Sequence, residues 1–379
     1  MHPPRRWHLR DSRPGDGACC IFGGTANSPY RRRSSDPPAV ACSGCRRRKV
    51  PPHASQRRKL PPHQPGRTGA REEADTGSAA CLGKAPASGV FDMQRHTVAL
   101  IAGDGIGPEI AASVKEIFAA AQVPVDFEEH EAGLACFEKT GSTLPASTID
   151  AIKRHRVALK GPTTTPLGGG HKSVNVTIRK SLELYANVRP SKSLPSVKTR
   201  FDNVDLIIVR ENIEDTYAGI EHWQSHDVCQ CLRLITRPGC EAIHRYAFNM
   251  ARSIGRKRVT CVHKSNIMKL TDGLFLDTFR EIAQQYPDIQ ADDILIDNLC
   301  MQLVVRPEKF DVLVLPNLFG DIASDLCAGL VGGLGVAPGG NIGDGTAVFE
   351  AVHGSAPDIA GKGLANPTAL LLSAVQMLY

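Results

Sequence analysis

The chain has 379 residues and a formal charge of +6, and its length allows a large core and two lobes. The positive charge is confined to residues 1–92, where 17 Lys and Arg face 7 Asp and Glu, while the remaining residues are slightly acidic. Because no basic excess lies in the patterned part and no apolar stretch reaches the ~18 residues of a membrane span, we expect no nucleic-acid and no membrane partner.

Residues 1–92 are crowded with Pro, Arg, Ser and Gly and show no apolar period, which predicts a disordered leader. The leader lacks the apolar core of a secretory signal. Its Arg-rich start would fit an organellar presequence, although stretches such as KLPPHQPGR are too rich in Pro for an amphipathic helix. Regular patterning begins directly after Met93, so we hypothesise that 1–92 is a spurious extension and that translation starts at Met93.

The cysteines indicate a reducing compartment. Seven of the 12 Cys follow the leader, scattered and mostly in apolar runs, as expected of small buried thiols. Within the leader, Cys42 and Cys45 form one C-x-x-C, which is a weak zinc signal without a second pair.

Strand-like and helix-like segments alternate after the leader. Residues 97–103 form a buried strand pattern, and Pro108 can open a helix. We expect the apolar face of that helix to consist of Ile110, Val114, Ile117 and Phe118. Further strands are predicted at 204–210, 258–264, 293–297 and 311–317, and helices at 239–254 and 271–285. This alternation predicts an α/β protein with a largely parallel core sheet.

Two glycine-rich stretches resemble nucleotide-binding motifs only in part. GDGIGPE (103–109) has Pro108 where a Rossmann fingerprint has its third Gly, so we expect a tight strand-to-helix turn. GGGHKS (168–173) has His171 rather than Gly before Lys172, which excludes an NTPase P-loop.

The stretch HKSVNVTIRK (171–180) predicts an anion site. Ser173, Asn175 and Arg179 place a hydroxyl, an amide and a guanidinium close together. A small polycarboxylate requires this combination, because neutral donors orient it and the forked cation pairs with a carboxylate.

Paired acids and strand-end side chains add further candidates. Asp321 and Asp325 are four residues apart on a predicted helix, so their carboxylates share one face. They could be a solvated helix start or, in the buried segment that Ile322 and Leu326 indicate, ligands of Mg²⁺ or Mn²⁺. Candidates at or after the ends of predicted strands are Arg210, Tyr217 and Lys264.

Eight segments, taken in order, resemble the β-decarboxylating dehydrogenases, the family of isocitrate and 3-isopropylmalate dehydrogenases. The resemblance runs from about Val98 to the end of the chain. It implies a large α/β domain, formed by 93–188 and a truncated 332–379, and a smaller dimerising α/β domain at 189–331, with no ordinary Rossmann fold. The segments are GDGIGPE, KGPTTTP, KSVNVTIRK, NVRP, RENIEDTYAGIEH, HKSNIMK, NLFGDIASD and HGSAPDIAGKGLANP.

The resemblance also implies roles for single residues. A homodimer with shared active sites is implied, in which Lys264 and Asp297 act in the partner's site. Lys264, with Asp297, assists removal of the hydroxyl proton, and Tyr217 protonates C3. The implied substrate ligands are Ser173, Asn175, Arg179, Arg189 and Arg210; the implied ligands of Mg²⁺ or Mn²⁺ are Asp297, Asp321 and Asp325; the implied NAD contacts are Thr165, His353, Gly354, Asp358, Ile359 and Asn366.

Within the family, the Ser-x-Asn-x-x-x-Arg pattern with Tyr217 resembles isocitrate dehydrogenases, which form 2-oxoglutarate. Asp358 at the ribose position implies NAD rather than NADP. Homoisocitrate dehydrogenase, 3-isopropylmalate dehydrogenase and a non-catalytic regulatory subunit remain alternatives. GPTTTPLGGG is closer to bacterial single-subunit enzymes, so we expect a cytoplasmic location, with the mitochondrial matrix as the alternative. Family members continue for tens of residues past the position of Tyr379.

Overall fold

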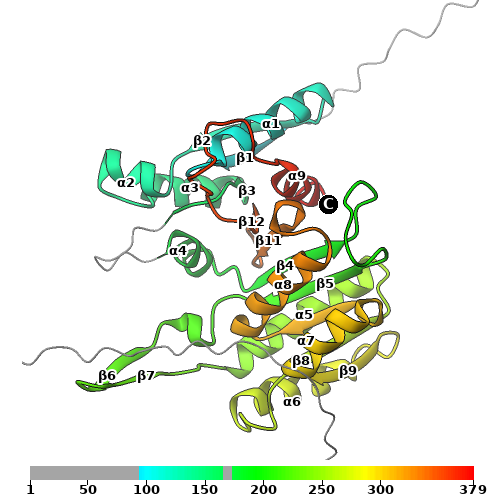
Figure 1. Ribbon diagram of the computed structural model, residues 1–379. Helices are drawn as coiled ribbons and strands as arrows, with labels where there is room; N and C mark the ends of the chain where they lie inside the picture. The colour runs from blue at the N-terminus through cyan, green and yellow to red at the C-terminus, as the bar shows by residue number, and fades with distance from the viewer. Residues whose placement is uncertain (1–93, 165–172) are drawn as a thin grey trace, which may run out of the picture. The chain divides into compact units, whose positions relative to one another are not determined.

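A computed structural model describes residues 94–164 and 173–379, and the predictions made for 1–92 and for GGGHKS lie largely outside these ranges. In the described part, ten strands form one mixed sheet in the order β2-β1-β3-β12-β11-β4-β5-β10-β8-β9 (Figure 1). These strands are β1 (His96–Ile101), β2 (Val125–His130), β3 (Val157–Lys160), β4 (Ala186–Lys192), β5 (Asp205–Glu211), β8 (Arg258–His263), β9 (Gln290–Leu295), β10 (Val312–Leu315), β11 (Pro338–Ile342) and β12 (Ala347–Ala351).

The sheet consists of two parallel groups joined by antiparallel strands. Strands β2, β1, β3 and β12 are mutually parallel, and so are β5, β10, β8 and β9. Between the groups, β11 and β4 pair antiparallel to each other and to their outer neighbours. The prediction of an α/β protein with a largely parallel sheet is therefore confirmed.

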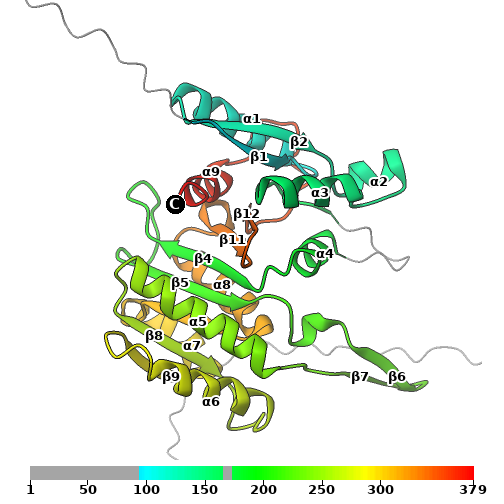
Figure 2. The ribbon, with the colours of Figure 1, turned by 180° about the vertical axis from the view of Figure 1, so that it is seen from behind.

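Helices cover both faces of each group, as the opposite views of Figures 1 and 2 show. On the first group, α1 (Gly107–Ala120) and α9 (Thr368–Gln376) pack on one face, and α3 (Ala146–His155) and α4 (Val174–Ser181) on the other. On the second group, α5 (Arg237–Ser253) and α6 (Thr271–Ala283) lie opposite α7 (Ile296–Val305) and α8 (Asn317–Leu330). Alternate residues of the inner strands pack into the cores on opposite faces of the sheet, so the sequence of a strand such as β10 is a continuous apolar run.

The shorter elements complete the described chain. Helix α2 (Leu134–Thr140) and the 3-10 turns η1 (Thr216–Ala218), η2 (Pro307–Lys309) and η3 (Leu334–Val336) connect the larger ones. The hairpin of β6 (Glu221–Ser225) and β7 (Val228–Cys231) is a separate two-stranded sheet, exposed at every position. Within the described ranges, none of the helices has the length and apolar character required to cross a membrane.

Three details differ from the sequence-based expectations. The strand expected at 293–297 is β9, which ends at Leu295, and Asp297 lies in the first turn of α7. Ile117 is 41% exposed and does not belong to the buried face of α1. Cys229 and Cys231 are exposed on the hairpin, unlike most of the other cysteines described. The boundaries of the two proposed domains stay a prediction.

The fold makes a testable prediction at His244, which is fully buried in α5 and interacts through Nε2 with the carbonyl of Phe275 at 2.9 Å. Burial lowers its pKa to about 3 from a usual 6.5. Between these values only the unfolded state binds the proton, so His244 contributes stability that is complete above pH 6.5 and is lost as the pH falls toward 3. Relative to His244→Gln, the wild type should lose about 1.4 kcal/mol of unfolding free energy per pH unit in this window. Urea unfolding at pH 7 and pH 5 measures this, and parallel pH dependence of the two proteins would contradict it.

Candidate functional site

Three of the quoted motifs meet at the end of β1. Gly103 and Gly105 have positive φ, and a Cβ atom on either would collide with the backbone oxygen of Pro162 or Ser355 at about 2 Å. The N–H of Ile106 donates to Ser355 at 2.9 Å, and the N–H of Thr164 donates to the Asp104 carboxylate at 2.6 Å. The prediction of a tight turn in GDGIGPE is confirmed, and the glycines allow two other loops to approach its backbone.

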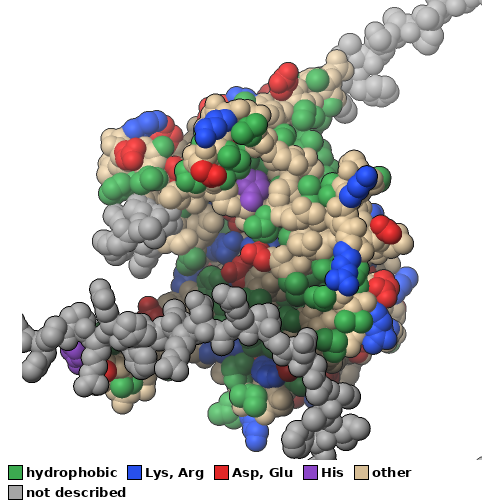
Figure 3. Space-filling view, in the orientation of Figure 1, with side chains coloured by type: hydrophobic (Ala, Val, Ile, Leu, Met, Phe, Trp, Pro, Cys, Tyr) green, Lys and Arg blue, Asp and Glu red, His purple; other side chains and the backbone are tan. Residues whose placement is uncertain are grey.

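A cavity of about 140 Å³ opens beside these loops, in the middle of the sheet. On the face of the molecule drawn in Figure 3, basic and acidic side chains gather in a recess between α4 and α8. Some predicted substrate ligands and some predicted cofactor contacts line this cavity together. Its lining includes Lys160, Thr163, Asn175, Arg179, Asn187, Arg189, Glu350, His353 and Gly354.

Three of the predicted anion-binding side chains are buried arginines. Arg179 lies in the last turn of α4, Arg189 in β4 and Arg210 near the end of β5, and none is more than 8% exposed. Burial, and after it the like charges of Arg210 and Arg179, lower the pKa of Arg189 to about 10. Within the described residues, the buried Nε atoms of Arg179 and Arg189 lack a hydrogen-bond partner. This concentration of positive charge favours a polyanionic ligand.

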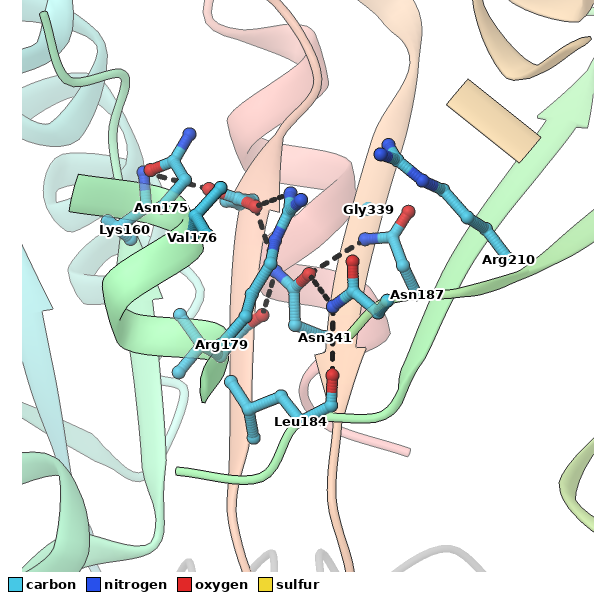
Figure 4. Close-up of polar contacts among 12 residues, drawn as sticks. Lys160, Asn175, Val176, Arg179, Leu184, Asn187, Arg210, Gly339 and Asn341 are labelled. Carbon is cyan, nitrogen blue, oxygen red and sulfur yellow. Dashed lines mark hydrogen bonds and ion pairs between the residues drawn. The ribbon is translucent and has the colours of Figure 1, made fainter. Parts of the chain in front are cut away.

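The neutral donors lie at the start of α4. The Ser173 hydroxyl caps the helix, accepting a long hydrogen bond of 3.5 Å from Val176 N–H. The Oδ1 atom of Asn175 accepts from the Thr163 hydroxyl at 3.1 Å, and Asn175 and Arg179 come from the same helix in Figure 4.

Asp321 is surrounded by two of the other predicted residues. It forms an ion pair with Arg210 and accepts a hydrogen bond from the Tyr217 hydroxyl at 2.5 Å. Burial would raise the pKa of Asp321, but Arg210 and Tyr217 outweigh it and lower that pKa. Burial, followed by the same Asp321 contact, raises the pKa of Tyr217. The tyrosine therefore keeps its proton at neutral pH.

Asp325 lies one turn further along α8, 3.5 Å from Nη1 of Arg189, and its side chain is 57% exposed. Burial raises its pKa and Arg189 offsets this only in part. Ile322 is 55% exposed, so the expectation of a largely buried segment was wrong there. Two oxygen ligands on one helix face fit part of a hard-cation site. Among the residues described, no group of three His, Cys, Asp or Glu is arranged to hold a metal ion.

Lys264 and Asp297 form their own pair away from the cavity lining. Lys264 directly follows β8, and its Nζ donates to Asp297 at 2.7 Å. The hydrogen bond to Lys264 lowers the pKa of Asp297. Neither side chain lines the cavity described above. The same is true of Ser173, Arg210, Tyr217, Asp321 and Asp325, so the cavity contains only part of the predicted set.

The predicted cofactor residues lie in two places. His353 and Gly354 line the cavity, and the buried Nε2 of His353 has no hydrogen-bond partner in the described part of the chain. Asp358 is exposed, and Ile359 packs against the core of the first strand group. Oδ1 of Asn366 accepts from the N–H of Thr368 at the start of α9. Thr165 lies outside the described residues.

The sequence reasoning missed the carboxylate beneath the arginines. Glu350 in β12 is buried and pairs with Lys160 Nζ at 2.8 Å and Arg179 Nη2 at 3.2 Å. Its Oε1 also accepts from the Asn341 amide at 2.8 Å, and the amides of Asn187 and Asn341 are joined beside it (Figure 4). Burial would raise the pKa of Glu350, but Lys160 and Arg179 hold it far below the usual range. An acid inside the apolar run AVFEAV was the available signal.

Comparisons with known proteins show the family of the chain. The family described as isocitrate/isopropylmalate dehydrogenase matches residues 97–379. Catalytic subunit 5 of the mitochondrial NAD isocitrate dehydrogenase of Arabidopsis thaliana is 57% identical over 74% of this chain and 76% of its own length. The chloroplastic 3-isopropylmalate dehydrogenase of Solanum tuberosum is 56% identical over 74% of this chain and 78% of its own. The solved structure of isocitrate dehydrogenase from Methylococcus capsulatus has a TM-score of 0.73 and 53% identity, covering 75% of this chain and 85% of that one.

Because Glu350 is buried, its charge should contribute strongly to the unfolding free energy. Glu350→Gln should lower the unfolding free energy by about 3–5 kcal/mol, because Lys160 and Arg179 lose a buried counter-charge. Glu131→Gln is the matched control, since Glu131 pairs with Lys139 at the surface and exposed pairs contribute little. Urea unfolding of the three proteins at pH 7 compares them. Equal stability of the two variants would show that the buried pairing does not stabilise the fold.

Proposed function

The chain belongs to the isocitrate/isopropylmalate dehydrogenase family, and we propose that it oxidises isocitrate with NAD and Mg²⁺ or Mn²⁺, releasing CO₂ and 2-oxoglutarate. The observation that carries this proposal is a cluster of three buried arginines. Arg179 and Arg189 line one small cavity, and Arg210 is near enough for its like charge to act on Arg189. Three guanidinium groups match the charge of a tricarboxylate better than that of a dicarboxylate with an apolar branch. The sequence identities to isocitrate and isopropylmalate enzymes are nearly equal, so the site chemistry rather than overall similarity supports the choice.

In the proposed mechanism the arginines hold the substrate carboxylates, and Ser173 and Asn175 orient the molecule. Bound NAD would supply the acceptor for the hydride that leaves C2. Lys264, with Asp297 beside it, takes the proton of the hydroxyl group. Tyr217 then donates its proton to C3 after CO₂ leaves; its raised pKa and its position against Asp321 support the role of a general acid.

Asp321 and Asp325 would hold the divalent cation, with Asp297 of a second subunit as a third ligand. The exposed carboxylate of Asp325 and its place beside Asp321 fit an oxygen-ligated hard cation. The bound cation would supply Lewis-acid stabilisation of negative charge on the substrate oxygen.

A homodimer with shared sites would complete the constellation. The side chains of Lys264 and Asp297 bond to each other and to none of the other proposed site residues that the structure describes, which fits a role in the site of the neighbouring subunit. Large exposed apolar side chains at Trp223 in the hairpin and at Ile267 and Leu270 after β8 also support burial in an assembly. The mitochondrial subunit among the relatives favours the matrix over the cytoplasm as the location.

A spectrophotometric assay tests the function. Purified full-length chain with NAD and Mg²⁺ should reduce NAD in the presence of isocitrate. Homoisocitrate and 3-isopropylmalate are the alternative substrates to compare. Homoisocitrate differs from isocitrate by one methylene, so the enzyme can discriminate between these two by only ~1–3 kcal/mol of transition-state binding. A higher kcat/KM for either competitor would replace the proposed substrate. Lack of turnover with all three would favour the non-catalytic regulatory alternative.

The metal assignment predicts the behaviour of Asp325→Asn. This variant should weaken Mn²⁺ binding about tenfold or more, because one of about three carboxylate ligands loses its charge. Asp325 is preferred to Asp321 as the target, since Asp321 also pairs with Arg210 and Tyr217. Electron paramagnetic resonance titration of free Mn²⁺ gives the affinity without turnover. Asp150→Asn, at an exposed position of α3, is the control, and an equal affinity of the two variants would contradict the assignment.

The exposed position of Asp358 makes the cofactor preference testable. A carboxylate beside the ribose accepts hydrogen bonds from the NAD hydroxyls and repels the 2′-phosphate of NADP. We expect NAD to be preferred by ~100-fold in kcat/KM, or about 2.7 kcal/mol. Asp358→Lys combined with Ile359→Tyr should move the preference toward NADP, whereas Asp277→Lys on α6 should not. Equal use of both cofactors by the wild type would refute the assignment.

A further inference from the structure

Arg233, which follows the β6–β7 hairpin, lies between two fully buried carboxylates. Its Nε is 3.0 Å from Oδ1 of Asp215, and its Nη2 is 3.2 Å from Oδ1 of Asp272. These contacts are ion pairs by distance, although their N–H directions do not satisfy hydrogen-bond geometry. The guanidinium also covers the ring of Phe319 at 4.5 Å. One cation therefore compensates two buried anions on different elements.

Asp215 uses its carboxylate to hold two backbone segments. Its Oδ1 accepts from the N–H of Thr216 at 2.8 Å, at the start of the turn that contains Tyr217. Its Oδ2 accepts from the N–H of Leu318 at 2.9 Å, in the first turn of the helix that carries Asp321. The backbone of Asp215 has φ 65° and ψ −150°, which an L-residue rarely adopts, so the surrounding contacts must fix it.

Asp272, in α6, holds the third segment. Its Oδ2 accepts from the N–H of Lys264 at 2.5 Å, directly after β8. Arg233 contacts the same loop a second time, because its Nη1 lies 3.3 Å from the sulfur of Met268. The ion pairs of Arg233 thus connect the backbone of Lys264 to the backbones next to Tyr217 and Asp321.

We propose that Arg233 is a positioning residue for the reaction, holding Tyr217 and Asp321 through Asp215 and holding Lys264 through Asp272. The inference rests on the proposed function, which gives these three side chains a common reaction. In the proposed homodimer, Lys264 acts in the neighbouring site. Arg233 would then connect Tyr217 and Asp321 of one site to the Lys264 segment, which the same subunit contributes to the neighbouring site.

Loss of Arg233 should disturb the chemical step more than substrate binding. Without the cation, Asp215 and Asp272 are two uncompensated buried charges that repel each other or recruit water. A displacement of the order of 1 Å in reacting groups can cost about 10²-fold in rate. Arg179 and Arg189 lie outside this network, so most of the grip on the substrate is retained.

The test compares Arg233→Met with Arg256→Met in the full chain. Arg256 is a matched control because it also bridges two aspartates, Asp205 and Asp311, away from the candidate site. Arg233→Met should lower kcat about 10²-fold and leave the KM for isocitrate within about threefold, and Arg256→Met should change neither by more than about threefold. Arg233→Lys should have a higher kcat than Arg233→Met, because it keeps the positive charge. The recovery should be partial, because the point charge of Lys cannot contact both carboxylates as the planar guanidinium does.

A second variant separates positioning from folding. Arg233→Met combined with Asp215→Asn and Asp272→Asn removes all three charges, and the amide oxygens can still accept from Leu318 and Lys264. This variant should unfold at a higher temperature than Arg233→Met and should regain part of its kcat. A similar kcat for Arg233→Met and Arg256→Met, or a loss confined to KM, would overturn the proposal.

Hydrogen exchange gives a readout that needs no turnover. In Arg233→Met, exchange should rise in peptides covering 215–219, 264–272 and 317–322, and in Arg256→Met it should not. If wild-type protein fails to oxidise isocitrate, the proposed function is wrong, and the exchange pattern still decides whether Arg233 holds these segments. Unchanged exchange in all three peptides would show that it does not.

Discussion

The burial of four cationic side chains near the centre of one sheet is the constraint on which the candidate site depends. Lys160, Arg179, Arg189 and Arg210 are each at most 8% exposed, and burial penalises the charged form of every such group. Glu350 pairs with Lys160 and Arg179, Asp321 pairs with Arg210 and Arg189, and Asp325 pairs with Arg189, so these four cations face three carboxylates. Positive charge remains in excess beside a small cavity. Because burial disfavours this uncompensated charge, the cavity favours a ligand that carries carboxylates.

Three loops approach one another closely beside this cavity. Gly103 and Gly105 have no Cβ to collide with Pro162 and Ser355, so the turn after β1 packs directly on loops that follow β3 and β12. The backbone groups brought together in this way bond to one another, as Ile106 does to Ser355. Any side chain at either glycine would separate the loops and widen the region in which the predicted cofactor residues His353 and Gly354 lie.

The sequence predicted the parts of the site that depend on local order, and it failed where distant segments decide the environment. Arg179 could be singled out by its polar neighbours and Arg210 by its place at the end of a predicted strand, whereas Arg189 was implied only by the family resemblance. AVFEAV signals an acid inside a buried strand, but it does not show which residues Glu350 contacts. Lys160 and Arg179 reach it only through sheet pairing and the packing of α4. Arg233 follows an exposed hairpin and has no local sign of burial. The end of β9 was misplaced because a short apolar run does not distinguish a strand from the first turn of a helix.

The amide contacts between β11 and β4 explain how the two strand groups can join at one register. Asn341 and Asn187 are directly opposite in the antiparallel pairing, and their side chains share a hydrogen bond of 2.9 Å. Asn341 also donates to Glu350, and Asn187 is opposite Arg210 in the next strand. A shift of one residue in either pairing would turn these polar side chains to the other face of the sheet and leave them without partners. The polar network at the site thus helps to specify the pairing of the strands that hold it.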